Sequence, residues 1–123
     1  MRHLRQHPQN LPPKLPEVGL MLYPDCQMGM VSGITDLFHV AGRFAAEHDR
    51  APIRVSHWRL QDGGGFVRCF DSHPGEPAHN APTILIAPGS LHKLLEAEEA
   101  VPYARWLLDR HAQGTTLAST CGG

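Results

Sequence analysis

The sequence predicts an α/β protein built on a doubly wound, mostly parallel sheet. Two nearly continuous apolar runs, residues 17–23 and 83–87, are typical of strands buried on both faces, as in a parallel sheet. Helical periodicity follows both runs, and strands that alternate with helices in this way indicate parallel β-α-β units. The chain has 123 residues and no internal repeat, so we expect a single domain.

The composition is that of an ordinary globular chain without strong charge. Hydrophobic residues make up 41% of the sequence and the formal net charge is -1, so the overall charge favours neither nucleic acid nor an anionic membrane. No apolar run is long enough to span a bilayer, and the first residues lack the apolar core of a secretory signal. The three cysteines, Cys26, Cys69 and Cys121, are widely spaced. We expect free thiols in a reducing compartment, and hence a cytoplasmic protein.

The first third of the chain is predicted to contain a tail, a strand and a helix. Residues 1–16 hold four prolines and no periodic apolar pattern, which predicts a disordered tail before a domain that spans residues 17–123. The apolar strand 17–23 follows directly. A helix is then predicted from about residue 28 to about residue 48, because apolar side chains recur there at the helical period.

The middle of the chain is expected to form a hairpin and then the second apolar strand. Residues 53–60 alternate well enough for a strand, and a glycine-rich turn leads to a partner strand at residues 66–70. A polar, proline-rich loop at residues 71–82 precedes the buried strand 83–87.

The last third is expected to complete the alternating pattern. A short helix is predicted around residues 91–97, and a longer one is predicted to begin near Pro102, because proline is favoured at the first helical position. Gly114 is a good C-terminal stop. The small and β-branched residues 115–119 then predict a buried strand.

Candidate functional residues gather where these strands end. Ligands of open α/β sheets sit beyond the carboxyl ends of the strands, which here are residues 23–27, 88–90 and 120–123. Cys121 follows a strand and precedes two glycines, as a nucleophile on a tight strand-to-helix turn requires. A buried, inert thiol is the alternative for Cys121.

Other polar groups have simpler interpretations. Cys26 and Cys69 are expected to be small hydrophobic residues. His73, Glu76 and His79 lie in a proline-rich loop without a recognised zinc spacing, and the glycines at 63–65 lack the Lys-Ser/Thr of a phosphate loop, so neither a metal nor a cofactor is expected. Three arginines are expected to be solvated charges on strand faces: Arg54, Arg59 and Arg68.

Four blocks in this order resemble the ThiJ/PfpI superfamily, which has a class I glutamine amidotransferase-like, flavodoxin-like fold. The blocks are residues 18–24, 54–56, 84–89 and 117–121, and the similarity covers residues 17–123. Within the superfamily, the chain is most similar to the N-terminal domain of GlxA-like AraC-family transcriptional regulators.

The resemblance implies roles for individual residues. Cys121 matches the elbow cysteine, and Gly89 and Ser90 match the loop that helps to form the oxyanion pocket. With Asp25 and Gly122, these residues form the expected ligand-binding set. Met30 stands where the enzymes of the superfamily carry an acid, and Gly122 where many of its hydrolases carry a histidine. General acid–base chemistry needs a titratable group near the reacting proton, so these departures favour a regulator over an enzyme.

The expected function is therefore that of a ligand-sensing and dimerisation domain of an AraC-type regulator. The expected partners are a small-molecule effector and a second copy of the chain, with DNA bound only through a helix-turn-helix domain absent from these residues. Because family members continue through a helix after the elbow, the resemblance implies a domain that is incomplete at its C-terminus. A cysteine-dependent hydrolase or lyase of the same superfamily is the alternative, and an inactive structural remnant is a third.

Overall fold

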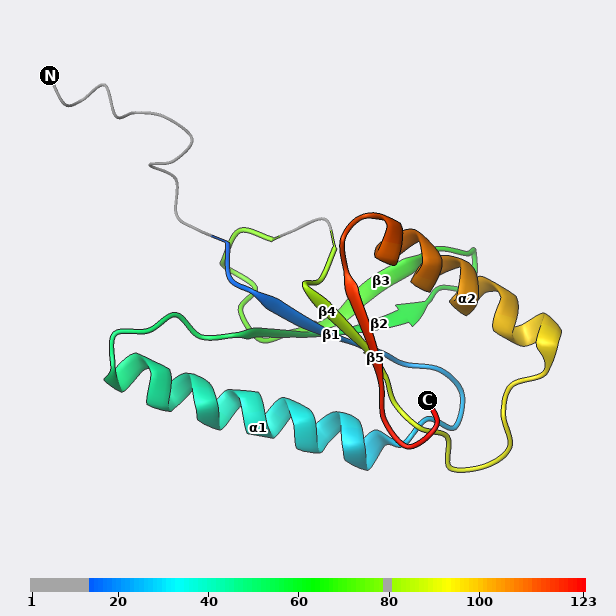
Figure 1. Cartoon of the computed structure of the whole chain (residues 1–123), viewed down its shortest axis with the longest axis horizontal. Helices are drawn as coiled ribbons and strands as arrows, with labels where there is room; N and C mark the ends of the chain where they lie inside the picture. The colour runs from blue at the N-terminus through cyan, green and yellow to red at the C-terminus, as the bar shows by residue number, and fades with distance from the viewer. Residues whose placement is uncertain (1–13, 79–80) are drawn as a thin grey trace, which may run out of the picture.

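A computed structural model describes residues 14–78 and 81–123 of the chain and contains a five-stranded sheet between two helices (Figure 1). The elements are β1 (Glu17–Met21), α1 (Met28–Glu47), β2 (Arg54–Leu60), β3 (Phe66–Asp71), β4 (Ile84–Ala87), α2 (Ala97–Ala112) and β5 (Thr116–Ser119). The strand order is β3-β2-β1-β4-β5. All neighbouring strands are parallel except β2 and β3, which form an antiparallel hairpin. The predicted α/β fold with a mostly parallel sheet is confirmed.

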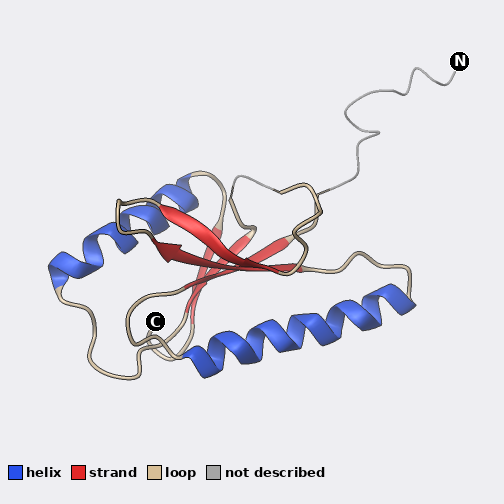
Figure 2. Cartoon of the chain, turned by 180° about the vertical axis from the view of Figure 1, so that it is seen from behind, coloured by secondary structure: helices blue, strands red, loops and turns tan. Residues whose placement is uncertain are grey.

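The two helices cover opposite faces of the sheet (Figure 2). Successive side chains of a strand point to opposite faces, so β1 sends Leu20 toward α1 and Met21 toward α2. Leu20 is fully buried and Met21 is 5% exposed. Both faces of β1 are therefore core, which explains why its sequence is an unbroken apolar run.

Each helix contributes three side chains to the core. The α1 side is formed by Val31, Ile34 and Phe38, and the α2 side by Tyr103, Trp106 and Leu107. Leu37 in α1 and Leu108 in α2, which also fit the helical period, are 63% and 67% exposed.

The start of α2 differs from the sequence prediction. No short helix forms around residues 91–97; residues 91–96 are irregular, and α2 begins at Ala97 with Pro102 inside it. Alanine and glutamate are good helix formers, and Glu98 and Glu99 complement the positive end of the helix dipole in its first turn. These preferences outweigh the cost of a proline beyond the first turn.

The last strand is also placed differently. The predicted buried strand at residues 115–119 is the exposed edge strand β5, and only Thr115, just before it, is buried. The residues that predict this strand form a local pattern in the sequence. The exposure of β5 instead follows from its position at the edge of the sheet, where it pairs with β4 alone. No helix in the described part of the chain is long and apolar enough to cross a membrane.

At the N-terminal side, residues 1–13 of the expected disordered tail lie outside the described residues. Leu15 is 9% exposed, and the Pro16 carbonyl accepts a hydrogen bond from the Arg54 amide at 2.9 Å. Leu15 and Pro16 of the predicted tail thus contact the folded domain.

A buried carboxylate joins the strands at the start of β1. Glu17 is fully buried, and its carboxylate accepts hydrogen bonds from the Ser56 hydroxyl on β2 and from Nε and Nη2 of Arg68 on β3. The Arg68 guanidinium also lies over the Trp58 ring, 4.6 Å from its centroid. The expectation that Arg68 is a solvated charge is wrong, because its fork-shaped donors match a carboxylate held inside the sheet.

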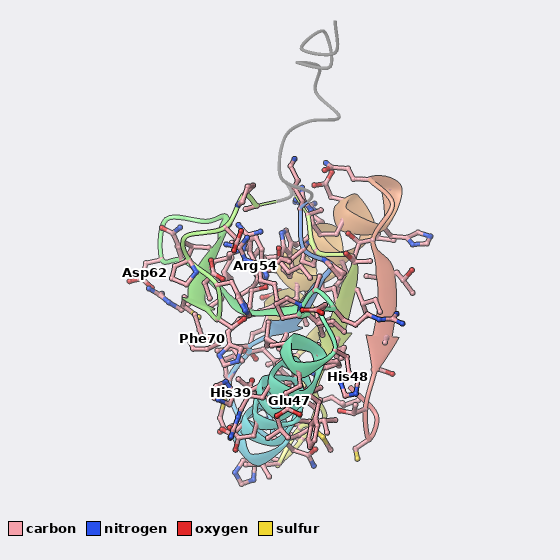
Figure 3. All side chains as sticks on the ribbon, turned by 90° about the vertical axis from the view of Figure 1, so that its left-hand side faces the viewer. His39, Glu47, His48, Arg54, Asp62 and Phe70 are labelled. Atoms are coloured by element: carbon pink, nitrogen blue, oxygen red, sulfur yellow. The ribbon has the colours of Figure 1, made fainter. Side chains whose placement is uncertain are left out.

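Arg54 is a buried cation, and the same expectation is wrong for it. Arg54 lies on β2 (Figure 3), and its side chain is 3% exposed. Its guanidinium pairs with the Asp71 carboxylate, 2.8 Å from Nε to Oδ1. Nη1 also donates to the carbonyls of Glu76 and Pro77, at 3.1 and 3.0 Å. The hydrogen bond between Arg54 and Asp71 holds the pKa of the Asp71 carboxyl below its usual value. Arg54 thus anchors the loop after β3 to the start of β2.

His57 connects β2 to α1. Its Nε2 lies 2.9 Å from the Thr35 hydroxyl, which donates its own hydrogen to the Val31 carbonyl at 2.7 Å. The imidazole must therefore be the donor to Thr35, which assigns the proton to Nε2. Its ring also packs on Phe70, with the centroids 4.5 Å apart. Burial lowers the pKa of His57, because the charged form would lose hydration there.

The Glu17–Arg68 pair yields a stability prediction. Replacing Arg68 by alanine leaves a buried carboxylate without its counter-ion, and we expect a loss of about 2–4 kcal/mol in the free energy of unfolding, in the range for breaking a buried pair and reduced by the partial exposure of Arg68. Arg59, exposed on the neighbouring strand, is the matched control. Arg59→Ala should change stability by no more than about 0.5 kcal/mol. Urea titrations followed by tryptophan fluorescence measure both; equal losses would contradict the assignment.

His57 yields a pH prediction. Because its pKa is lower in the folded state than in the unfolded state, the folded protein binds fewer protons, and stability should fall as the pH drops below about 6.5, the usual histidine value. His57→Gln should flatten this dependence in urea titrations between neutral and mildly acidic pH. His92→Gln, which changes an exposed side chain, should leave it intact. If the stability of His57→Gln still falls as the pH drops, another group is responsible for the pH dependence.

Candidate functional site

Three loops meet at the carboxyl ends of β1, β4 and β5. The Gln27 amide donates to the Gly89 carbonyl at 2.8 Å, and the Leu91 amide donates to the Asp25 carbonyl at 2.8 Å. Cys26 and Ser90 form an isolated antiparallel bridge between the same two loops. These backbone contacts bring together the loops in which the sequence places the candidate residues.

Cys121 occupies a strained turn directly after β5. Its φ angle is 48°, in the left-handed region that residues other than glycine rarely adopt. Gly122 follows with a φ of 82°. Gly89 lies against this turn: a Cβ added to it would be 2.9 Å from the Cys121 carbonyl oxygen and 3.0 Å from the Cys121 Cβ. Only a glycine at 89 lets the β4 loop approach the cysteine so closely. Strain of this kind is common at functional sites.

The Cys121 thiol has no acid–base partner in the described residues. The residue is exposed, and within residues 14–78 and 81–123 no hydrogen bond or ion pair involves its side chain. Ser90, expected near the oxyanion pocket, uses its hydroxyl inside its own loop, accepting from the His92 amide and donating to the Lys93 carbonyl, both at 3.2 Å. The turn presents a thiol without the groups that would activate it.

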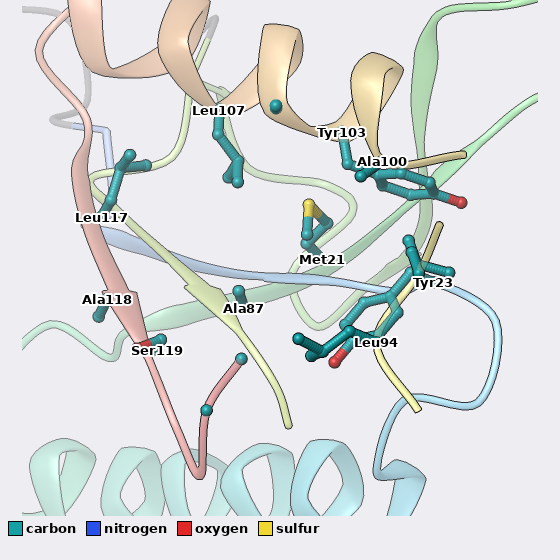
Figure 4. A pocket seen from close by; sticks show the side chains of 14 residues that line it. Met21, Tyr23, Ala87, Leu94, Ala100, Tyr103, Leu107, Leu117, Ala118 and Ser119 are labelled. Atoms are coloured by element: carbon teal, nitrogen blue, oxygen red, sulfur yellow. The ribbon is translucent and has the colours of Figure 1, made fainter. Parts of the chain in front are cut away.

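An apolar cavity of about 550 Å³ opens beside this turn, between α2 and the ends of the strands (Figure 4). Its walls come from three strands, from α2 with the loop before it, and from the turn after β5. The lining residues are Met21, Tyr23, Ala87, Leu94, Leu95, Ala100, Tyr103, Ala104, Leu107, Leu117, Ala118, Ser119, Gly122 and Gly123. A largely apolar cavity with a few hydroxyl groups is typical of a small-molecule site.

The polar groups of the cavity are neutral hydroxyls. Tyr23 donates its hydroxyl to the Pro88 carbonyl, which fixes its ring beside the β4 loop. Burial raises the pKa of Tyr23 and of Tyr103, and the nearby Cys26 thiol adds a smaller contribution to each. Both tyrosines therefore stay protonated at neutral pH. Ser119 supplies a third hydroxyl from β5.

The expected ligand-binding residues divide between the cavity and its surroundings. Gly122 lines the cavity; Asp25, Gly89, Ser90 and Cys121 do not. Asp25 instead borders a neighbouring hollow of about 550 Å³, which shares Tyr23 and Tyr103 with the cavity.

Sequence reasoning missed most of the cavity because its lining is apolar. The one local indication was the series of small and large apolar residues between Leu94 and Leu107. The sequence pattern places these residues in a short helix and on the core-facing side of the longer helix.

The structure also locates the other cysteines and the described candidate metal ligands. Cys26 is buried with its sulfur 3.7 Å from that of Met28, as expected of a small hydrophobic residue, whereas Cys69 is exposed on β3, contrary to expectation. All three cysteines are free. Among the described residues no three His, Cys, Asp or Glu side chains form a group that could hold a metal ion, and His79 lies outside the described residues.

Comparison of the chain with protein-family models, with curated proteins and with solved structures finds no match.

The contact between Gly89 and Cys121 yields a further prediction. Gly89→Ala places a methyl group against the Cys121 backbone, and we expect a loss of about 1–3 kcal/mol, the usual cost of overpacking. Gly75→Ala is the control, since a Cβ there would meet no atom within 4 Å. Urea titration gives the stabilities. If the two variants are equally stable, the close approach of the two loops does not hold in solution.

Proposed function

We propose that this chain is the ligand-sensing domain of an AraC-type transcriptional regulator, with a class I glutamine amidotransferase-like fold of the ThiJ/PfpI kind. The observation that carries the proposal is the apolar cavity at the carboxyl ends of β1, β4 and β5, beside the turn that holds Cys121. Ligands of open α/β sheets bind at this end of the strands. A regulator of this type acts in the cytoplasm.

The surroundings of Cys121 support sensing over catalysis. A cysteine enzyme needs a base, or a group that stabilises the thiolate, within hydrogen-bond reach of the sulfur. The described part of the chain offers none, and Met30 stands where the resemblance expects an acid. A sensor needs only a cavity that binds a ligand and a neighbouring part of the protein whose conformation responds to binding.

The chemistry of the cavity restricts the effector. Apolar side chains form most of the wall, and the three hydroxyls of Tyr23, Tyr103 and Ser119 are its main polar groups. The site has no charged side chain in its lining. We therefore propose a small, uncharged effector with an apolar body and one hydrogen-bonding group.

A cysteine-dependent hydrolase or lyase is the second candidate, and one observation favours it. Cys121 is both exposed and held at a positive φ, a combination that a nucleophile on a tight turn would show. Cys121 and Gly122 belong to the same turn, and Gly122 lines the cavity.

Cavity binding is tested with indole and cyclohexanol, each an apolar ring with one polar group. We expect both to shift backbone amide resonances of residues 118–123 and of α2. Ala104→Phe should abolish these shifts, because the new ring fills the cavity, whereas Ala112→Phe, on the same helix and outside the lining, should retain them. Shifts that persist in Ala104→Phe would place binding elsewhere.

Cys121 variants separate the two candidates. A sensor should bind the same probes when Cys121 is replaced by alanine, because the residue does not line the cavity. An ester or glyoxal turnover above background that disappears in Cys121→Ser would favour the enzyme instead.

The regulatory role is tested on the natural product of the gene. The proposal expects an intact mass well above 13.5 kDa, the mass of these residues, and binding to DNA that changes when a cavity ligand is added. A natural product of 13.5 kDa without affinity for DNA would contradict it.

A further inference from the structure

A second hollow lies on the opposite face of the sheet from the cavity, between α1 and the hairpin of β2 and β3. This α1 hollow has a volume of about 710 Å³ and shares no lining residue with the cavity. Its floor is apolar: Val55 near the start of β2 is buried, and Pro52 and Ile53 precede it. A hollow of this size with an apolar floor is suited to a small molecule.

A β-bulge turns Phe70 toward the α1 hollow. The register shifts between His57 and Trp58, because Cys69 is an extra residue in β3. Side chains alternate along a strand, so without the extra residue Phe70 would share the face of Arg68. With it, Phe70 lies beside His57 on the face that α1 covers, yet stays 40% exposed. A ring that is redirected in this way and left partly open is available to pack on a ligand.

Polar side chains form the rim of the α1 hollow. Helix α1 contributes Asp36, His39 and Arg43, all of them exposed. Within residues 14–78 and 81–123, none of the three forms a hydrogen bond or an ion pair. Figure 3 shows His39 of α1 and Phe70 of β3 on the same flank of the molecule. The rim thus holds charged and polar groups whose hydrogen bonds are open to a ligand.

The loop after β3 contributes His73 from the opposite wall. The Ser72 hydroxyl accepts a hydrogen bond from the Val55 amide at 2.8 Å and lies 2.8 Å from Nδ1 of His73. When the hydroxyl donates its hydrogen to Nδ1, the neutral imidazole carries its own proton on Nε2. His73 then keeps a donor for a ligand, and the bond to Val55 holds the loop at the start of β2.

The basic and acidic groups lie at different ends of the α1 hollow. Gly42 is packed close to Pro52, just before β2, so its neighbour Arg43 lies at the end that holds His73. Asp36 precedes Arg43 by seven residues, about 10 Å along the helix axis. The end near Arg43 therefore suits an anion, while Asp36 disfavours a second negative charge.

We propose that the α1 hollow binds a planar aromatic monocarboxylate, with its ring between Phe70 and α1 and its carboxylate at Arg43 and His73. The planar guanidinium of Arg43 matches a carboxylate with two parallel hydrogen bonds. Phe70 and Phe38 supply aromatic surface for the ring. A single negative charge fits one arginine better than a phosphate dianion does, because Asp36 lies in the same hollow.

The test is titration of the whole chain with indole-3-acetate, followed by backbone amide resonances. We expect shifts in α1 between residues 35 and 46 and at residues 70–73. Arg43→Gln should weaken binding by about tenfold or more, because the carboxylate loses its charged partner. Arg50→Gln, which removes an exposed charge outside the lining, should leave it unchanged. Indole-3-ethanol, which has the same ring and no charge, should bind this hollow at least tenfold more weakly than the acid.

Two further variants test the position of the ring. Ala46→Trp should abolish the shifts, because the new side chain fills the hollow, whereas Ala41→Trp, exposed on the same helix outside the lining, should retain them. Circular dichroism melts check that all variants remain folded. An absence of shifts in the native chain, or binding that Arg43→Gln and Ala46→Trp leave unchanged, would overturn the proposal.

The α1 hollow does not depend on the cavity, on Cys121 or on the proposed regulator. Shifts at residues 118–123 report on the cavity, and shifts at residues 70–73 report on the α1 hollow. Either site can therefore fail while the other stands. Indole-3-acetate shifts confined to residues 118–123 would place the acid in the cavity and contradict the inference.

Discussion

The buried carboxylate of Glu17 is the constraint on which the sheet depends. An isolated charge inside a protein is very costly, so this side chain is tolerated only when its partners are in place. Those partners are Ser56 on β2 and Arg68 on β3, while the Glu17 amide donates to the Thr83 hydroxyl just before β4. One residue at the start of the central strand thereby links β1 to β2, β3 and the residue before β4. A shift of β3 would leave the Glu17 charge without its counter-ion, and a shift of β2 or β4 would break a hydrogen bond.

This register also determines what happens at the other end of the strands. With β1 held between β2 and β4, and β5 beside β4, the loops after β1, β4 and β5 converge within hydrogen-bond distance. Gly89 is then pressed against the turn at Cys121. The cavity between this turn and α2 is a consequence of the same arrangement, because small side chains such as Ala87 and Ala104 line it.

The molecule combines paired buried ions inside with apolar surface outside. The buried ions are paired, whereas α1 exposes large hydrophobic side chains along one stripe and β5 exposes its whole length at the sheet edge. Exposed apolar surface of this extent marks places of interaction.

The sequence by itself determined most of the elements, although not the start of α2. The apolar runs, the helical period of α1 and the glycine turn of the hairpin all depend on near neighbours. It also located the candidate loops and the tight turn at Cys121, because turn residues act locally. Only the tertiary structure decided that Arg54 is a buried ion, that Arg68 pairs with the buried Glu17, that β5 is an exposed edge and that an apolar cavity lies under α2. Each of these depends on residues far apart in the chain. Burial and pairing are properties of the assembled sheet, which no local pattern encodes.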